Sequence, residues 1–169
     1  SRAGARSLAR ERSVDRVKTP RFLFVLGVGE GAAAHPVWPD LHQRFEGEVD
    51  VDGSWFAWRL TGANHRELGR SCRVFPTLAD ARDGAAALRD RVHDAEMTVL
   101  TVPRTGTWGW RLRLDGAAIA TSSRGYARHR ECTYNASTFV AAAAIADLSD
   151  ADPPPVWQLT ESRLPDGAL

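Results

Sequence analysis

The sequence predicts an α+β fold: two tandem β-β-β-α repeats with pseudo-twofold symmetry, whose strands form an antiparallel sheet packed by two helices, plus an N-terminal extension. The first observation is a repeated tripeptide, since Trp58-Arg59-Leu60 returns 52 residues later as Trp110-Arg111-Leu112. The second is that large apolar residues occupy every second position around each tripeptide, the pattern of a strand with one buried face. The third is that apolar residues at helical spacing follow each stretch. Two copies with a period of about 50 residues fit a symmetric pair better than an open array.

Length and composition set the broad class of protein. With 169 residues, 43% of them hydrophobic and 25% charged, the chain has the size and composition of a globular protein with a real core. No apolar run reaches the roughly 18 residues of a membrane-spanning helix, so the sequence predicts no membrane partner. The two cysteines, Cys72 and Cys132, form no metal-binding pattern and indicate free thiols in a reducing compartment. A single disulfide between them is the alternative.

The N-terminus differs in character from the rest of the chain. Residues 1–21 hold seven basic and two acidic residues, and we expect a basic flexible arm that either binds an anionic partner or is simply solvated. Residues 22–44 are an N-terminal extension with one predicted strand, Phe22–Val28, and a Pro-rich linker. A basic arm before an apolar run is also the order of a secretory signal. The run is short and interrupted by Gly27, so we expect a cytoplasmic protein.

Residues 45–94 are the predicted first repeat. Its predicted strands are Phe45–Val51, Trp55–Thr61 and Leu68–Cys72. Asp52-Gly53 is a typical hairpin turn, so we expect the first two of these strands to pair. The helix should begin after Thr77, because a threonine followed three residues later by an acidic residue is close to the capping-box pattern.

Residues 95–148 are the predicted second repeat, with the same order of elements. Its predicted strands are Glu96–Val102, Trp108–Leu114 and Ala117–Ser122, and its helix runs from about Arg128 to Leu148. The first of these strands is apolar on both faces, which is typical of a strand covered on both sides. The cover comes from the first repeat, from the N-terminal segment or from another chain. A Pro-rich C-terminal tail, residues 149–169, follows.

Further features recur at the same spacing in both copies. Each Trp-Arg-Leu strand is followed by a turn, a strand that ends in serine, an aromatic residue, and a helix with a small residue six positions past the aromatic. These residues are Ser71, Phe75 and Ala81 in the first copy and Ser122, Tyr126 and Cys132 in the second. The pattern resembles the tandem YegP-like family of small prokaryotic proteins of unknown function over roughly residues 45 to 148. The resemblance implies an α+β fold of two packed repeats that often self-associates, with no established reaction.

The chain departs from the family pattern at a few positions. Phe75 replaces the usual tyrosine, Leu78 and His129 stand where the family favours lysine, and Arg128 stands where a helix-capping serine is usual. A role that depends on the lysine is therefore not expected of this chain.

Alternation along the repeated strands separates core residues from surface residues. Trp58 and Trp110 share a face with leucines, so we interpret them as structural core. Phe75 and Tyr126, which end the two sets of strands, are assigned to the same core.

The arginines of the repeated tripeptide point away from that core. Arg59 and Arg111, with Trp55 and Arg113 beside them, are the predicted partner-binding residues, because paired cations next to an aromatic side chain can hold an anionic partner. The alternative is a cross-strand ion pair, for example between Arg59 and Glu48.

No catalytic or metal-binding pattern emerges from the sequence, so we nominate no catalytic residue, no metal ligand and no cofactor. The leading hypothesis is a non-enzymatic interaction or scaffold module that binds a protein partner or itself through an exposed sheet face or edge. The alternative is a nucleic-acid-binding accessory protein that uses the basic arm and the face of Arg59, Arg111 and Arg113.

Overall fold

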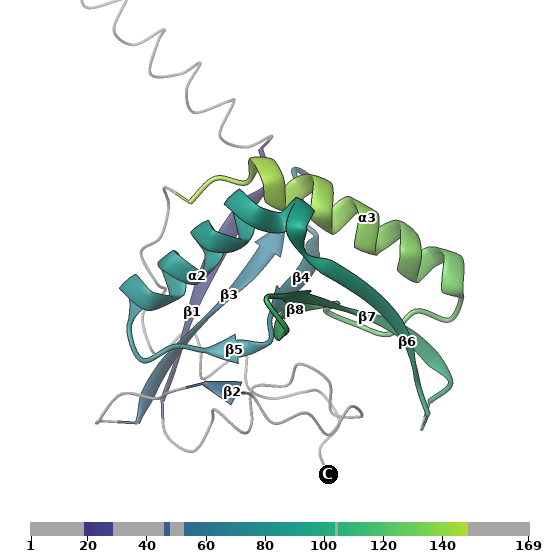
Figure 1. The fold of residues 1–169 in the computed structure, drawn as a ribbon, viewed down its shortest axis with the longest axis horizontal. Helices are drawn as coiled ribbons and strands as arrows, with labels where there is room; N and C mark the ends of the chain where they lie inside the picture. Colours follow the sequence, from purple (N-terminus) through teal and green to yellow (C-terminus); the bar gives the residue numbers. More distant parts are fainter. Residues whose placement is uncertain (1–18, 29–45, 48–52, 104, 149–169) are drawn as a thin grey trace, which may run out of the picture.

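Two helices cover one face of a six-stranded antiparallel sheet (Figure 1). The computed structural model describes residues 19–28, 46–47, 53–103 and 105–148. In spatial order, the strands of the sheet are β1 (Arg21–Val28), β3 (Ser54–Thr61), β4 (Glu67–Ser71), β8 (Ala117–Thr121), β7 (Thr107–Leu114) and β6 (Glu96–Val102). The helices are α2 (Leu78–Arg91), which continues into the 3-10 turn η2 (Val92–Asp94), and α3 (His129–Ile145). A separate parallel pair consists of β2 (Glu46–Gly47) and β5 (Arg73–Val74).

The α+β class, the antiparallel sheet and the two packing helices are confirmed. β6 has the bounds that its residue pattern predicts, β3, β7, β8 and α3 begin and end within a few residues of their predicted limits, and α2 begins directly after Thr77 as predicted. Thr77 caps α2 as expected, because its hydroxyl accepts a hydrogen bond of 3.1 Å from the backbone N–H of Asp80. Local patterns therefore located most elements correctly.

The hairpin predicted at Asp52-Gly53 is wrong, because both sides of β3 are taken by other segments. β1 pairs with β3 along its whole length, from Arg21 opposite Thr61 to Val28 opposite Ser54. The other side of β3 is paired with β4 and, by an isolated bridge, with Phe75. The strand predicted from Phe22 to Val28 is thus present, but as the neighbour of β3.

Burial explains why β1 takes this place in the sheet. Phe22 and Phe24 enter the core from β1 with exposed fractions of 1% and 4%. In the stretch 45–51, acidic residues alternate with Phe45, Gly47, Val49 and Val51, so its apolar face carries one phenylalanine where β1 carries two. Within that stretch, Glu46 and Gly47 form β2, which pairs with β5, and residues 45 and 48–51 lie outside the described ones.

The start of β1 also revises the limit of the predicted N-terminal arm. Residues 19–21 belong to the fold, because the carbonyl of Pro20 accepts a hydrogen bond of 2.8 Å from the N–H of Asp147. The N–H of Phe22 in turn donates to the carbonyl of Asp147 at 3.0 Å. The remainder of the arm, residues 1–18, and the tail from residue 149 onward lie outside the described residues.

The two serines that end the repeated strands make the same contact. The backbone N–H of Trp58 donates to Oγ of Ser71 at 3.2 Å, and that of Trp110 donates to Oγ of Ser122 at 3.2 Å. Both serines are fully buried. Each hydroxyl therefore satisfies a main-chain donor that would otherwise be buried without a partner.

The aromatic residues that follow the strands also make matching contacts. Phe75 exchanges two backbone hydrogen bonds with Phe56, at 2.7 and 2.8 Å, and Tyr126 exchanges two with Trp108 at the same pair of distances. These bridges hold each connection to its helix against the first residues of a tryptophan strand.

The main core lies between the sheet and the two helices. Trp58 and Trp110 are 2% and 1% exposed and form its centre, and Tyr126 is 8% exposed at its margin. The ring of Trp110 packs against Phe139 of α3 with a centroid distance of 4.6 Å. Phe75 is half-buried and packs against this core. Burial of such large apolar side chains is worth about 1.5–3 kcal/mol each, so these tryptophans join the helices to the sheet.

Candidate interaction surfaces

A row of side chains crosses the face of the sheet that is opposite the helices. Strand register places Arg59 of β3 beside Arg70 of β4, Arg70 beside Thr121 of β8, and Thr121 beside Arg111 of β7. We call Arg59, Arg70 and Arg111 the arginine row. Arg113 lies two residues further along β7 on the same face. The structure therefore brings three of the four predicted partner-binding residues to one face and adds Arg70, which sequence reasoning missed.

The arginines of the row differ in their polar partners. Arg70 forms a two-pronged ion pair with Glu67, with distances of 2.9 and 2.8 Å from its Nε and Nη2. The Nε atoms of Arg59 and Arg111 are buried and, within the described residues, donate to no acceptor. The ion pair predicted between Arg59 and Glu48 falls outside the described residues. Arg59 and Arg111 therefore retain unused donors, while Arg70 is held in place on its own strand.

The thiol of Cys72 lies near two positive charges of this face. Burial raises the pKa of Cys72 to about 12, against the opposing effect of the positive charges of Arg111 and Arg113. These two guanidinium groups therefore lie close to Cys72, and the thiol is protonated and unreactive at neutral pH.

Trp55 does not belong to the candidate surface, although it was predicted there. It is only 5% exposed and packs in a second, small cluster with Ala57 and Val74 of β5. Gly27 of β1 lies directly against its indole ring, so a side chain at that position would overlap the ring. Alternation located the correct face of β3, but it could not show that a second layer covers this end of the strand.

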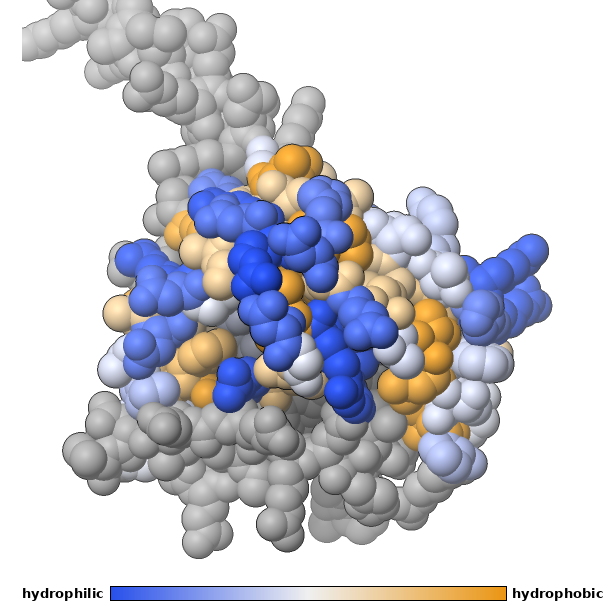
Figure 2. All heavy atoms as spheres, in the orientation of Figure 1, coloured by the Kyte–Doolittle hydropathy of each residue, from blue (hydrophilic) through white to orange (hydrophobic). Residues whose placement is uncertain are grey.

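The outer edge of β6 is a different kind of candidate surface. β6 pairs with β7 over seven residues without a register shift, and in the described part of the chain no strand pairs with its other side. Glu96, Thr98 and Thr101 are exposed, whereas Met97, Val99 and Leu100 are half-buried. Figure 2 shows hydrophobic residues gathered at the right of the molecule, where Figure 1 places this strand.

The opposite edge of the sheet is partly closed. The start of β1 is bridged by the backbone of Asp147, which runs parallel to it at Arg21. Because this bridge uses main-chain groups at the beginning of β1, the edge of β6 is the more open of the two as far as the described residues extend.

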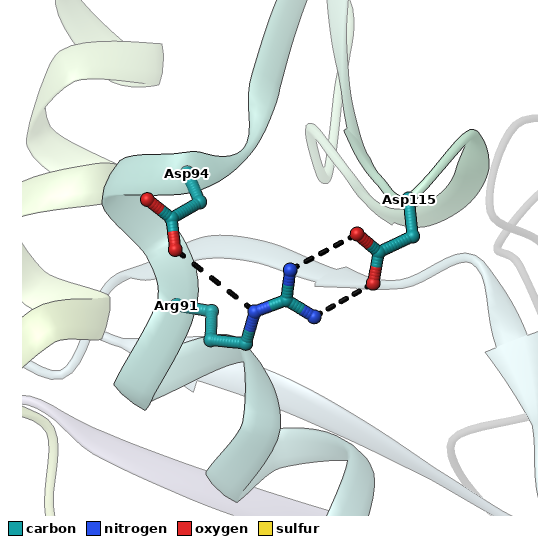
Figure 3. Close-up of polar contacts among 3 residues, drawn as sticks. All are labelled: Arg91, Asp94 and Asp115. Carbon is teal, nitrogen blue, oxygen red and sulfur yellow. Dashed lines mark hydrogen bonds and ion pairs between the residues drawn. The ribbon is translucent and has the colours of Figure 1, made fainter.

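An exposed ion pair joins the end of α2 to the turn between β7 and β8. Arg91 donates two hydrogen bonds to the carboxylate of Asp115, at 2.6 and 2.9 Å, and its Nε lies 3.9 Å from Asp94 (Figure 3). The hydrogen bonds and charge of Arg91 lower the pKa of Asp115 below its ordinary value. The contact connects the end of α2 to the turn that follows β7.

The described residues bring no metal-binding group together, and the pKa of each cysteine thiol is raised. No group of three or more His, Cys, Asp or Glu side chains is placed to hold a metal ion in the part of the chain that the structure covers. Cys132 is fully buried, and burial raises its pKa to about 11. The ring of His129 packs edge-on against Trp108 with a centroid distance of 4.8 Å. Both thiols are therefore protonated at neutral pH, and the imidazole packs against an indole ring.

Comparison of the chain with protein-family models, curated proteins and solved structures finds no match. None of the described helices has both the length and the apolar composition needed to cross a bilayer. The candidate surfaces thus rest on the geometry of this chain alone.

Proposed function

We propose that the protein is a non-enzymatic interaction module that binds a protein partner, or a second copy of itself, through the outer edge of β6. The observation that carries this proposal is a long and regular strand edge that no other described strand covers. The N–H and C=O groups of such an edge form a template for another strand. Main-chain hydrogen bonds then supply affinity, and alternate side chains supply specificity.

The composition of β6 supports this role. Proteins usually protect an open edge with lysines, prolines, bulges or short strands. β6 has the sequence Glu-Met-Thr-Val-Leu-Thr-Val, with one charge at its first position, and it pairs with β7 without a bulge. An edge without these features is prone to pair with another strand, so the composition of β6 favours a partner that binds there.

Matched contacts support the further proposal that the predicted repeats, residues 45–94 and 95–148, are related by a pseudo-twofold axis between β4 and β8, with β1 in the place of the predicted first strand of the first repeat. The contacts of Ser71 and Phe75 correspond to those of Ser122 and Tyr126 in partner atoms and in distance. β1 and β6 then occupy equivalent positions at the two edges. The same four residues carry the resemblance to the YegP-like family, so the matched contacts also favour that assignment. Two free thiols suit a cytoplasmic location.

The role of the β6 edge is tested with three immobilised proteins, namely wild type, Thr98→Lys and Thr133→Lys. Each is exposed to the same protein mixture, and the proteins that it retains are compared. Thr98→Lys places a charge at an exposed position of β6 and should abolish retention, because a lysine on an edge strand disfavours strand pairing. Thr133→Lys makes the same exchange at an exposed position of α3 and should retain the same proteins as wild type.

Light scattering on the same three proteins detects a second copy as the partner. Association of wild type and Thr133→Lys, but not of Thr98→Lys, would identify self-association through β6. The proposal fails if Thr98→Lys binds as wild type does, or if all three proteins are monomers that retain nothing.

A second candidate function is nucleic-acid binding by the basic arm together with the face that carries Arg59, Arg111 and Arg113. The arginine row is the specific observation in its favour, because several cations on one face attract a phosphate backbone. This candidate predicts salt-sensitive retention on DNA or RNA that weakens when residues 1–18, which precede the fold, are removed. If neither this deletion nor the charge reversal Arg113→Glu changes retention on DNA or RNA, nucleic-acid binding is excluded.

A further inference from the structure

We infer that the arginine row is a binding site for an extended chain of phosphate groups, which it recognises by charge and without contact to bases. The inference narrows the nucleic-acid candidate to one face of the sheet and names the chemistry of its ligand. It depends neither on the edge of β6 nor on the N-terminal arm.

The spacing of the row favours an extended anion over a compact one. Arg59, Arg70 and Arg111 project from β3, β4 and β7, and β8 lies between the last two strands. With about 4.8 Å between neighbouring strands, the row spans about 14 Å. Arg70 is held by Glu67 on its own strand. A single phosphate therefore cannot contact the whole row, whereas a chain of phosphates laid across the strands can.

The unused donors define how such a chain would be held. The Nε atoms of Arg59 and Arg111 are buried and have no acceptor among the described residues. A buried donor without a partner costs about 1–3 kcal/mol, so an acceptor that reaches these atoms gains correspondingly. The guanidinium group presents its donors in a fork that fits the oxygens of a phosphate. Arg113, which is exposed on the same face, adds a further positive charge.

The surroundings of the row argue against recognition of bases. Proteins that bind single-stranded nucleic acid stack the bases on aromatic side chains. Among the described residues of β3, Trp55 is the aromatic residue on the same face as Arg59, and it is only 5% exposed. Recognition would then be limited to the phosphate backbone of the ligand, and its base sequence would have little effect on affinity.

The same surroundings argue against an acidic peptide as the ligand. A peptide bound to a sheet usually gains main-chain hydrogen bonds at a strand edge. The row lies in the interior of the sheet, where β3, β4, β8 and β7 are each paired on both sides. A ligand that carries charge at every unit and needs no main-chain pairing suits this site better.

Binding titrations on the full chain test the inference with four probes: inorganic polyphosphate, oligothymidylate with a similar number of phosphates, orthophosphate and polyglutamate. We expect polyphosphate and oligothymidylate to bind with similar, salt-dependent affinities and the other two to bind far more weakly. Arg59→Gln and Arg111→Gln should each weaken polyphosphate binding about tenfold and reduce the salt dependence by about one unit of slope. Arg130→Gln, which alters an exposed arginine on α3, is the matched control and should have no effect.

Arg59→Gln and Arg111→Gln change half-buried residues, so a loss of binding can also come from a loss of folding. Arg113→Gln separates the two effects, because Arg113 is exposed. It should also weaken binding while leaving the unfolding midpoint unchanged. The inference is overturned if orthophosphate competes fully, if polyglutamate binds as well as polyphosphate, or if oligothymidylate binds far more tightly than polyphosphate. It is equally overturned if the three variants of this face bind as Arg130→Gln does. In that last case retention by the arm alone would still leave the nucleic-acid candidate standing.

Discussion

At the scale of single residues, the fold depends on hydroxyl groups placed where the sheet cannot pair its own main chain. Ser71 and Ser122 are fully buried and accept hydrogen bonds from the backbone of the two central tryptophans. These hydroxyl groups prevent a backbone N–H from being buried without an acceptor. A buried donor without a partner lowers the free energy of unfolding by more than a typical hydrogen bond raises it.

Substitution of either serine by alanine should therefore destabilise the protein by about 1–3 kcal/mol. Chemical unfolding measures this change, and the two variants should lose similar amounts because their contacts match. Ser137→Ala is the control, since Ser137 is exposed on α3 and donates its hydroxyl to the carbonyl of Thr133 within the same helix. Equal stabilities of all three variants would contradict the importance of the buried contact.

Residue patterns predicted part of the candidate surface and missed the rest. Alternation along single strands was sufficient to place Arg59 and Arg111 on one face. Arg70 could not be added in this way, because its position beside Arg59 depends on a register shift between Leu60 and Thr61. Trp55 was misjudged for a related reason, since no local pattern shows which end of a face is covered by another layer.

At the scale of elements, the two helices begin differently. Thr77 caps α2 with its side chain, whereas Arg128 precedes α3 in the same extended conformation without a side-chain hydrogen bond to the helix. Serine and threonine are preferred at this position because they satisfy a free N–H of the first turn.

Thr77→Ala should therefore lower the free energy of unfolding by about 1 kcal/mol, and Arg128→Ser should raise it by about 0.5–1 kcal/mol. Denaturant titrations of both variants provide the measurement. Thr133→Ala, which removes an exposed hydroxyl within α3, is the control and should change stability little. A destabilising effect of Arg128→Ser would show that Arg128 contributes more than its weak contact with Glu131 at 3.9 Å.

Elements were predicted more reliably than their pairing. The bounds of β6 and the cap of α2 follow from local sequence, because period and capping depend on neighbouring residues. The partner of β3 does not, because Asp52-Gly53 favours a nearby hairpin while the buried phenylalanines of β1 favour a strand much earlier in the chain. Apolar burial outweighed the local turn preference.

At the scale of the whole molecule, the ion pair of Arg91 with Asp115 connects α2 to the far turn of the β7–β8 hairpin (Figure 3). Arg91 lowers the pKa of Asp115 in the folded state. A lowered carboxyl pKa adds stability above the pKa of the unfolded state, and this stability is lost as the pH falls through the lowered folded pKa.

Asp115→Asn should consequently remove a part of the loss of stability on acidification and leave the fold intact, since asparagine tolerates the positive φ of 51° at this turn. Unfolding midpoints measured from neutral to acidic pH for the variant and wild type provide the comparison. The effect should be small and should shrink at high salt, because both side chains are exposed. Parallel pH curves for the two proteins would contradict the assignment.

The outer edge of β6 is the central functional claim, and backbone hydrogen exchange tests it most directly. Amide exchange is measured on wild type alone and again either with a retained partner or at a concentration where light scattering reports association. The account predicts that alternate amides of Glu96–Val102 exchange more slowly in the associated state, while those in the interior of the sheet do not change. Association that slows exchange elsewhere and leaves the amides of β6 unchanged would contradict it.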